Sequence, residues 1–84
     1  MEKALKLREI FEDKIKKCCD KIQYYNDECL NLEKENQNYR ITVYKYRENS
    51  SKIAYYKRII DDLKPGLKTY REVLHIINNV LEEN

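Results

Sequence analysis

Apolar side chains recur along the chain in alternating steps of four and three residues, beginning at Phe11. This spacing keeps one stripe of an α-helix apolar, and its repeat of seven residues is typical of a coiled coil. The stripe is interrupted by Asn36, Ser50 and Lys57. With Asn36 included, it contains Phe11, Ile15, Cys18, Ile22, Tyr25, Cys29, Leu32, Asn36, Tyr39, Val43, Tyr46, Ile53 and Ile60. We predict one long coiled-coil helix over residues 1–62 that buries this stripe against a partner.

A second stripe in a different phase becomes stronger after Ile53. It contains Tyr56, Ile60, Leu63, Leu67, Tyr70, Leu74, Ile77 and Leu81. The step from Ile53 to Tyr56 inserts an advance of three residues, a stammer, which overwinds a supercoil locally or marks a change of partner. The stammer follows "ENSS", residues 48–51, where helix propensity is weakest. We therefore expect a register slip between Ser50 and Tyr56.

The only proline and the only glycine are adjacent, at Pro65 and Gly66. Proline lacks a backbone N–H and disfavours the helical conformation at the preceding residue. We predict a kink or tight turn at 63–67 and a shorter C-terminal helix over 68–84. The apolar face of that helix is broad enough to fold back on the first helix or to join a bundle of three or four helices. The predicted fold class is all-α, assembling with partner helices.

Composition supports a helix that needs partners. Charged residues make up 38% of the chain and the mean hydropathy is −0.91, which is too polar for a compact core. The net charge of +2 is far from the basic balance of a dedicated nucleic-acid module. No apolar run is long enough for a membrane span, and no signal-peptide hydrophobic region follows Met1. We expect one interaction module without a membrane partner.

The candidate chemistry is sparse. The three cysteines are an odd number and two of them are adjacent, which does not suit a disulfide framework and indicates a reducing cytosolic or nuclear compartment. Cys18 and Cys29 lie on the apolar stripe, where a thiol acts as a small hydrophobe. The single histidine, His75, has no nucleophile or carboxylate set beside it, and a lone Gly66 cannot form a phosphate loop. We predict no enzyme activity, no catalytic or metal-binding residues and no cofactor.

Residues 38–58 combine five tyrosines with six lysines and arginines. A basic surface with exposed aromatic rings can stack bases and contact phosphates, so a nucleic-acid-binding helix over 39–58 is an alternative. The string "YRITVYKY", residues 39–46, is also compatible with a strand because it is β-branched and aromatic. The heptad spacing runs through both stretches, so we favour tyrosines that face a helical seam.

Side chains beside the stripe indicate what the partner is. In a parallel homodimer Tyr25 would face its own copy and crowd the seam, and a partner with small residues opposite would relieve this. Lys14 and Lys21 would find no acid in a second copy. We therefore favour a hetero-oligomer with another coiled-coil protein over a homodimer. Asn36 is either a register device that needs an amide opposite or a tolerated polar residue.

A dispersed set of short motifs resembles a known family. The string "REIFEDKIKKCCDKI", residues 8–22, is followed by Cys29, by "YRENSSKI" at 46–53, by Lys64-Pro65 and by Tyr70-Arg71. This order is similar to the N-terminal region of the vertebrate meiotic family, named after homeobox antisense, of the synaptonemal complex central element. The resemblance implies a nuclear, chromosome-bound structural protein that supports synapsis in meiosis with another coiled-coil protein. A kinetochore or spindle-pole coiled-coil subunit is the alternative within the same class.

Overall fold

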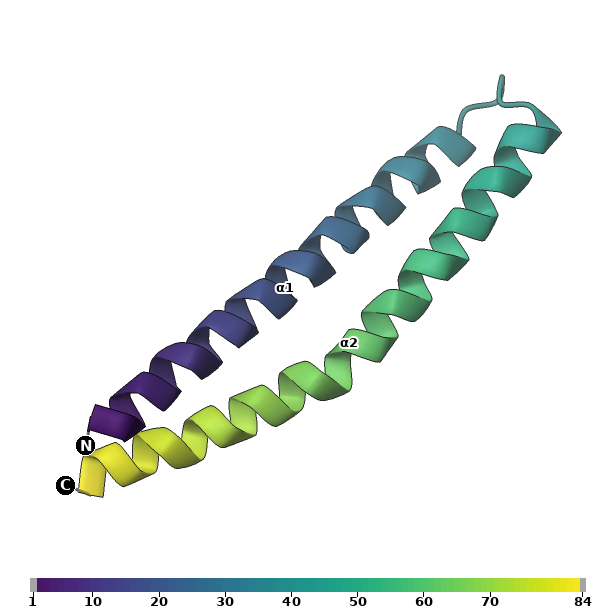
Figure 1. Ribbon diagram of the computed structural model, residues 1–84. Helices are drawn as coiled ribbons and strands as arrows, with labels where there is room; N and C mark the ends of the chain where they lie inside the picture. Colours follow the sequence, from purple (N-terminus) through teal and green to yellow (C-terminus); the bar gives the residue numbers. More distant parts are fainter. Residues whose placement is uncertain (1, 84) are drawn as a thin grey trace.

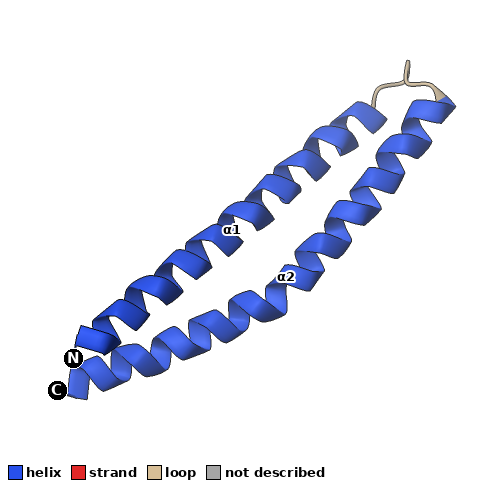
Figure 2. Cartoon of the chain, viewed as in Figure 1, coloured by secondary structure: helices blue, strands red, loops and turns tan. Residues whose placement is uncertain are grey.

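The chain forms two long helices that lie side by side in opposite directions (Figure 1). A computed structural model describes residues 2–83, with α1 spanning Glu2–Asn36 and α2 spanning Val43–Glu83. The hairpin measures 63 × 15 × 14 Å, and both ends of the chain lie at the same end of it. No strand occurs within residues 2–83 (Figure 2), so the all-α prediction is confirmed and the strand interpretation of 39–46 is wrong.

The first helix ends much earlier than predicted, because a turn over residues 37–42 interrupts the expected helix 1–62. The Asn38 side chain accepts a hydrogen bond from the Arg40 N–H over 3.0 Å, and the Asn38 carbonyl accepts one from the Ile41 N–H over 3.0 Å. Thr42 then caps α2, since its hydroxyl accepts a hydrogen bond from the Lys45 N–H over 3.0 Å. Short polar side chains thus satisfy backbone groups that a continuous helix would have paired.

This turn also explains the change of phase between the two apolar stripes. The stripe of α1 ends at Asn36, and the stripe of α2 begins at Asn49 and runs in uninterrupted steps of four and three through Ile53 and Tyr56. The predicted stammer is therefore wrong, because the two stripes belong to two helices that face each other. When the heptad count is continued across residues 37–42, the two stripes look like one stripe with a register slip.

The predicted kink or tight turn at 63–67 is confirmed as a kink (Figure 1), whereas the separate helix 68–84 is wrong, because Pro65 lies inside α2. Figure 1 shows α2 changing direction near its middle, so the proline bends the helix without ending it. The carbonyl of Asp61 loses its usual helical partner here, and Asp61 and Pro65 are both on the exposed side, where water can solvate that carbonyl. Seam residues before and after the bend pack on α1, and this packing outweighs the local preference of proline.

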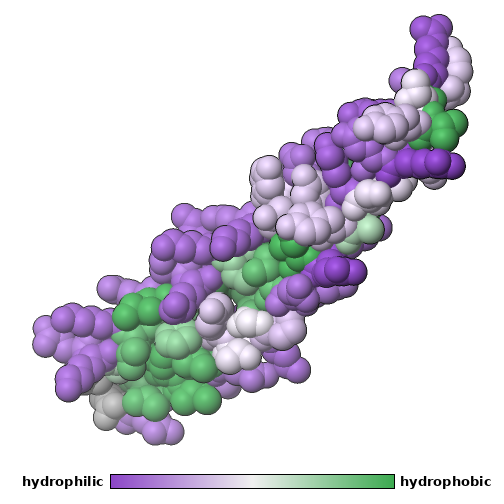
Figure 3. All heavy atoms as spheres, turned by 45° about the vertical axis from the view of Figure 1, so that its right-hand side comes forward, coloured by the Kyte–Doolittle hydropathy of each residue, from purple (hydrophilic) through white to green (hydrophobic). Residues whose placement is uncertain are grey.

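The core is a single thin seam between the helices. Its most buried apolar residues are Cys18, Cys29, Ile60, Leu67 and Ile77. Apolar atoms gather over the half of the hairpin that holds the chain ends, whereas hydrophilic atoms dominate toward the turn (Figure 3). A hairpin of this shape has only one buried side per helix, so much of its surface remains open to other helices.

Candidate functional site

Most residues predicted to contact a partner are turned toward the other helix of the same chain. They are all buried or half-buried, and they are Phe11, Ile15, Cys18, Ile22, Tyr25, Cys29, Leu32 and Asn36 from α1 and Ile53, Tyr56, Ile60, Leu63, Leu67, Tyr70, Leu74, Ile77 and Leu81 from α2. The heptad pattern thus located the buried stripes of both helices. The side that each stripe faces is filled by the chain itself.

Three predicted seam residues lie outside the seam. Tyr39 is 86% exposed, Val43 is 69% exposed and Tyr46 is 49% exposed. Tyr39 belongs to the turn, and the other two lie in the first turns of α2, before its seam begins. Their assignment to the buried stripe is wrong because the turn over 37–42 changes the phase of the helix that follows.

Aromatic rings pair across the seam in two layers that are two heptads apart. The rings of Tyr25 and Tyr56 are 5.4 Å apart and tilted by 38°, and those of Phe11 and Tyr70 are 5.9 Å apart and nearly perpendicular at 67°. Tilted and edge-to-face arrangements suit the ring quadrupoles. The chain therefore places an aromatic ring, and not a small residue, opposite Tyr25.

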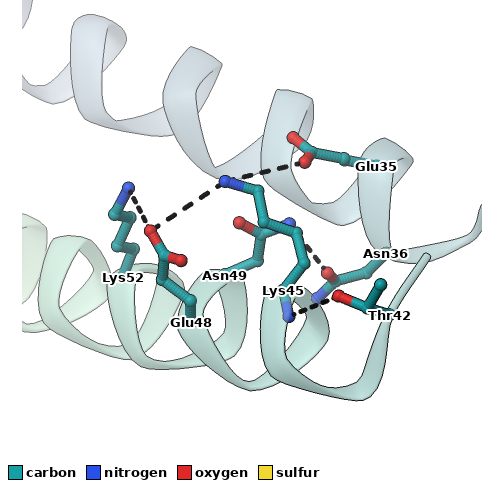
Figure 4. A network of polar contacts seen from close by, with 7 residues as sticks. All are labelled: Glu35, Asn36, Thr42, Lys45, Glu48, Asn49 and Lys52. Carbon is teal, nitrogen blue, oxygen red and sulfur yellow. Dashed lines mark hydrogen bonds and ion pairs between the residues drawn. The ribbon is translucent and has the colours of Figure 1, made fainter.

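Near the turn the seam becomes polar (Figure 4). Asn49 is fully buried, and its Nδ2 donates a hydrogen bond to Oδ1 of Asn36 over 3.0 Å. Asn36 in turn donates to the hydroxyl of Ser50 over 3.4 Å. The amide that Asn36 requires is thus supplied by the same chain. The sequence analysis missed Asn49 because it placed Ser50 on the apolar stripe. A second asparagine 13 residues after Asn36 could have indicated an amide pair across a helical hairpin.

Ion pairs surround this polar layer. Lys45 lies 4.0 Å from Glu35 across the seam and 3.9 Å from Glu48 on its own helix, and Lys52 lies 3.3 Å from Glu48. These side chains are all partly exposed, so each pair contributes less than about 1 kcal/mol. Their arrangement neutralises Lys45 and Lys52, two of the six basic residues that had suggested a nucleic-acid surface.

Two of the cysteines are part of the seam. The Cys18 thiol donates to the Leu63 carbonyl over 3.7 Å, and the Cys29 thiol donates to the Ile53 carbonyl over 3.9 Å. Burial raises the pKa of the Cys29 thiol, and the neighbouring carboxylate of Glu33 raises it further. Both thiols are therefore placed as packing residues.

Ion pairs between the helices distinguish the two flanks of the seam. Glu33 and Lys57 are 3.5 Å apart on one flank, and Glu35 and Lys45 are 4.0 Å apart on the other. Residues a whole number of heptads apart share a flank. Leu7, Lys14 and Lys21 are whole heptads from Glu35 and so continue its flank toward the open end. Ile10 and Lys17 lie about one turn from them, and Ile76 lies about one turn from Val73, which is four heptads from Lys45. We call the surface made of Leu7, Ile10, Lys14, Lys17 and Lys21 of α1 and Ile76 of α2 the lysine face.

Other kinds of site have little support in the arrangement of side chains. Within residues 2–83 no group of three or more His, Cys, Asp or Glu side chains is placed to hold a metal ion. No described helix is long and apolar enough to cross a membrane. His75 is exposed on α2. That the chain is not an enzyme stays a prediction.

The fold and the site define a class, the antiparallel α-helical hairpin with a coiled-coil seam. No family model, no curated protein and no solved structure matches the chain in the comparisons. The comparisons therefore neither support nor contradict the resemblance to the synaptonemal complex family.

Proposed function

We propose that the chain is a non-catalytic assembly protein whose hairpin binds helices of other proteins. One observation supports this proposal above all others. The seam leaves five apolar residues no more than 9% exposed, whereas large apolar side chains away from it remain exposed on both helices, including Leu7, Ile10, Leu30, Ile76 and Val80. Exposed apolar patches commonly mark protein interfaces, and apolar atoms gather over the half of the hairpin that holds the chain ends (Figure 3).

The energetics of a two-helix hairpin support the same conclusion. Full burial of a large apolar side chain contributes about 1.5–3 kcal/mol, and the conformational entropy of each ordered residue opposes it by about 1–2 kcal/mol. A single seam with few fully buried residues therefore gives a marginal fold. Docking of further helices would bury the exposed apolar residues and stabilise the hairpin by mass action.

A test begins with capture of partners by the tagged full chain from its source tissue, followed by mass spectrometry. Each captured protein is then purified and titrated into the hairpin while thermal unfolding is followed by circular dichroism. We expect a helical partner that binds directly and raises the unfolding temperature. A folded hairpin that binds no captured protein directly, or that converts a substrate, would contradict the proposal.

The biological process is proposed from the resemblance alone, which points to chromosome synapsis in meiosis within the synaptonemal complex central element. Localisation separates this proposal from the kinetochore or spindle-pole alternative. Signal along paired chromosome axes in meiotic prophase would support the first. Signal at kinetochores or spindle poles in dividing somatic cells would support the second.

A nucleic-acid role has one observation in its favour, which is the exposure of the tyrosines near the turn. Tyr39 and Tyr44 are 86% and 78% exposed, and the guanidinium of Arg40 lies 5.4 Å from the centre of the Tyr39 ring. Arg47 is exposed nearby. Titration with DNA or RNA at increasing salt tests this role. Tight binding that Arg40→Glu with Arg47→Glu abolishes, in a hairpin that stays helical, would favour it over the assembly role.

A further inference from the structure

The lysine face combines exposed apolar side chains with cations that are poorly neutralised. At the open end of the hairpin, Leu7 is 46% exposed, Ile10 is 49% exposed and Ile76 is 61% exposed. Two to four helical turns further along α1 from Leu7, Lys14, Lys17 and Lys21 follow on the same side. The three lysines thus form a cationic half of this side, next to an apolar patch that Lys3, one heptad before Ile10, borders at the open end.

A hollow between the helices lies in the cationic half. It has a volume of about 200 Å³ and is lined by Lys14, Lys17, Cys18, Lys21, Leu63 and Tyr70. Gly66 lies on the same flank by heptad spacing, and a Cβ built on it meets nothing within 4 Å. The missing side chain leaves space beside an apolar floor, and lysine ammonium groups form the rim.

The charge of this rim is left largely uncompensated by the described part of the chain. Lys17 pairs with Asp13 at 2.9 Å on its own helix. The ammonium of Lys14 lies 5.7 Å from the centre of the Tyr70 ring, and neither Lys14 nor Lys21 has an ion pair among residues 2–83. The equivalent positions near the turn are neutral overall, since Lys45 is paired with Glu35 and Glu48.

We propose that the lysine face binds an amphipathic helix of another protein that presents apolar residues to Leu7, Ile10 and Ile76 and carboxylates to Lys14 and Lys21. This inference rests on the proposed function and specifies the surface and the chemistry of the partner. A helix laid along the face meets apolar surface first and cations next, so its own acids must be concentrated in one half. Carboxylates within reach of the lysines add specificity and faster association.

A second copy of this chain does not provide that chemistry. If two copies packed through this face in parallel, each lysine would face its own counterpart. If they packed in antiparallel fashion about Lys14, then Lys21 would face Leu7, and Lys14 would still face Lys14. Both of these arrangements place like charges together or leave charges against apolar side chains. An offset antiparallel arrangement brings Lys14 to Glu35 and Lys21 to Glu28, but it takes Glu35 from Lys45 and leaves Leu7 against the polar turn. We therefore assign the acids to a different protein, and a dimer is an outcome of the test.

The experiment uses the full chain and a designed peptide as a probe. The peptide has three heptads with leucine at the two core positions of each heptad and glutamate beside them in the half that would meet the lysines. A matched peptide has lysine in place of each glutamate. We expect the glutamate peptide to bind, the lysine peptide to bind at least about tenfold more weakly, and added salt to weaken the first complex.

Variants locate the binding surface. Lys14→Glu with Lys21→Glu should weaken binding of the glutamate peptide about tenfold, which corresponds to the loss of two exposed ion pairs and the gain of repulsion. Lys6→Glu with Lys16→Glu carries the same charge change on exposed positions of α1 outside the face and should bind as the unchanged chain does. Circular dichroism confirms that both variants remain helical.

Several results would overturn the inference. These are equal binding of both peptides, equal weakening by both pairs of substitutions, and a dimer in analytical ultracentrifugation that Ile10→Asp dissociates. Preferential binding of anionic vesicles by the lysine face would also overturn it. If natural partners bind the hairpin tightly after Lys14→Glu with Lys21→Glu, the assembly role stands and this face is excluded as the site.

Discussion

The side chains of Asn36 and Asn49 join the last turn of α1 to the second turn of α2 through a hydrogen bond of 3.0 Å. Asn49 is fully buried, and its Oδ1 has no hydrogen-bond partner within residues 2–83. A buried amide pair of this kind fixes one register for the two helices, because any slip leaves both amides unsatisfied.

This pair predicts a non-additive response to substitution. Asn36→Leu leaves the buried amide of Asn49 without its acceptor and should lower the free energy of unfolding by about 1–3 kcal/mol. Asn36→Leu with Asn49→Leu removes both polar groups and should recover most of that loss. Urea denaturation followed by circular dichroism measures each variant. Losses that simply add in the double variant would show that the two amides do not interact.

Leucine positions inside and outside the seam should respond very differently to truncation. Leu67 is buried opposite α1, so Leu67→Ala should lower the free energy of unfolding by about 2–5 kcal/mol through lost packing and a cavity. Leu30 is 55% exposed on α1, and Leu30→Ala should change stability by no more than about 0.5 kcal/mol in the isolated chain. Thermal and urea unfolding of both variants check the seam. Similar losses at both positions would contradict the assignment.

Gly66 offers a stabilising substitution. It lies inside α2 without a positive φ, and a Cβ there meets nothing within 4 Å, so Gly66→Ala gains helix propensity without a clash. We expect the free energy of unfolding to rise by about 0.5–1 kcal/mol. The matched variant Ala54→Gly, at an exposed position of the same helix, should lower it by a similar amount. A loss of stability in Gly66→Ala would mean that flexibility beside Pro65 is required for the bend.

The raised pKa of Cys29 predicts a loss of stability at alkaline pH. In the unfolded chain the thiol ionises near its ordinary value of 9.0, whereas in the hairpin burial and Glu33 keep it protonated to higher pH. The contribution of the protonated Cys29 thiol to the free energy of unfolding is therefore complete below pH 9, and it is lost as pH rises through the pKa of the folded state. The Cys29→Ala variant should show a shallower fall of unfolding free energy above pH 9 than the unchanged chain.

A control distinguishes this effect from the titration of lysines and tyrosines in the same range. Cys19→Ala removes a thiol at the edge of the seam, one that accepts a hydrogen bond from Arg71 over 3.7 Å. It should keep the steeper pH dependence. Identical slopes for Cys29→Ala and the unchanged chain would remove Cys29 as the source.

Periodicity was sufficient to predict helical structure and most of the buried positions, but not where each helix begins and ends. The steps of four and three from Phe11 to Asn36 and from Tyr56 to Leu81 mark residues that are buried or half-buried in the hairpin. Such patterns depend only on which side of a helix is apolar, and that information is local. They do not state whether the opposing helix belongs to the same chain.

The turn could not be read from periodicity because its signals are weak. Residues 37–42 contain no glycine or proline, and "NYRITVYKY" continues the apolar spacing across the turn by chance. The turn depends on two hydrogen bonds from backbone N–H groups to the side chains of Asn38 and Thr42. Pro65 was read correctly as the site of a kink (Figure 1), but not as part of one helix, since packing on both sides of it holds a helix that its local preference would interrupt.

The shared position of the two chain ends has a practical consequence. Any sequence or label joined before α1 or after α2 emerges at one end of a rod that is 63 Å long, and the turn that contains the exposed Tyr39 lies at the other end (Figure 1). A hairpin attached to a surface or labelled through its chain ends therefore keeps the turn, at the far end, accessible to binding partners. Labels of increasing bulk at the two ends should first obstruct contacts next to Leu7, long before they reach the turn.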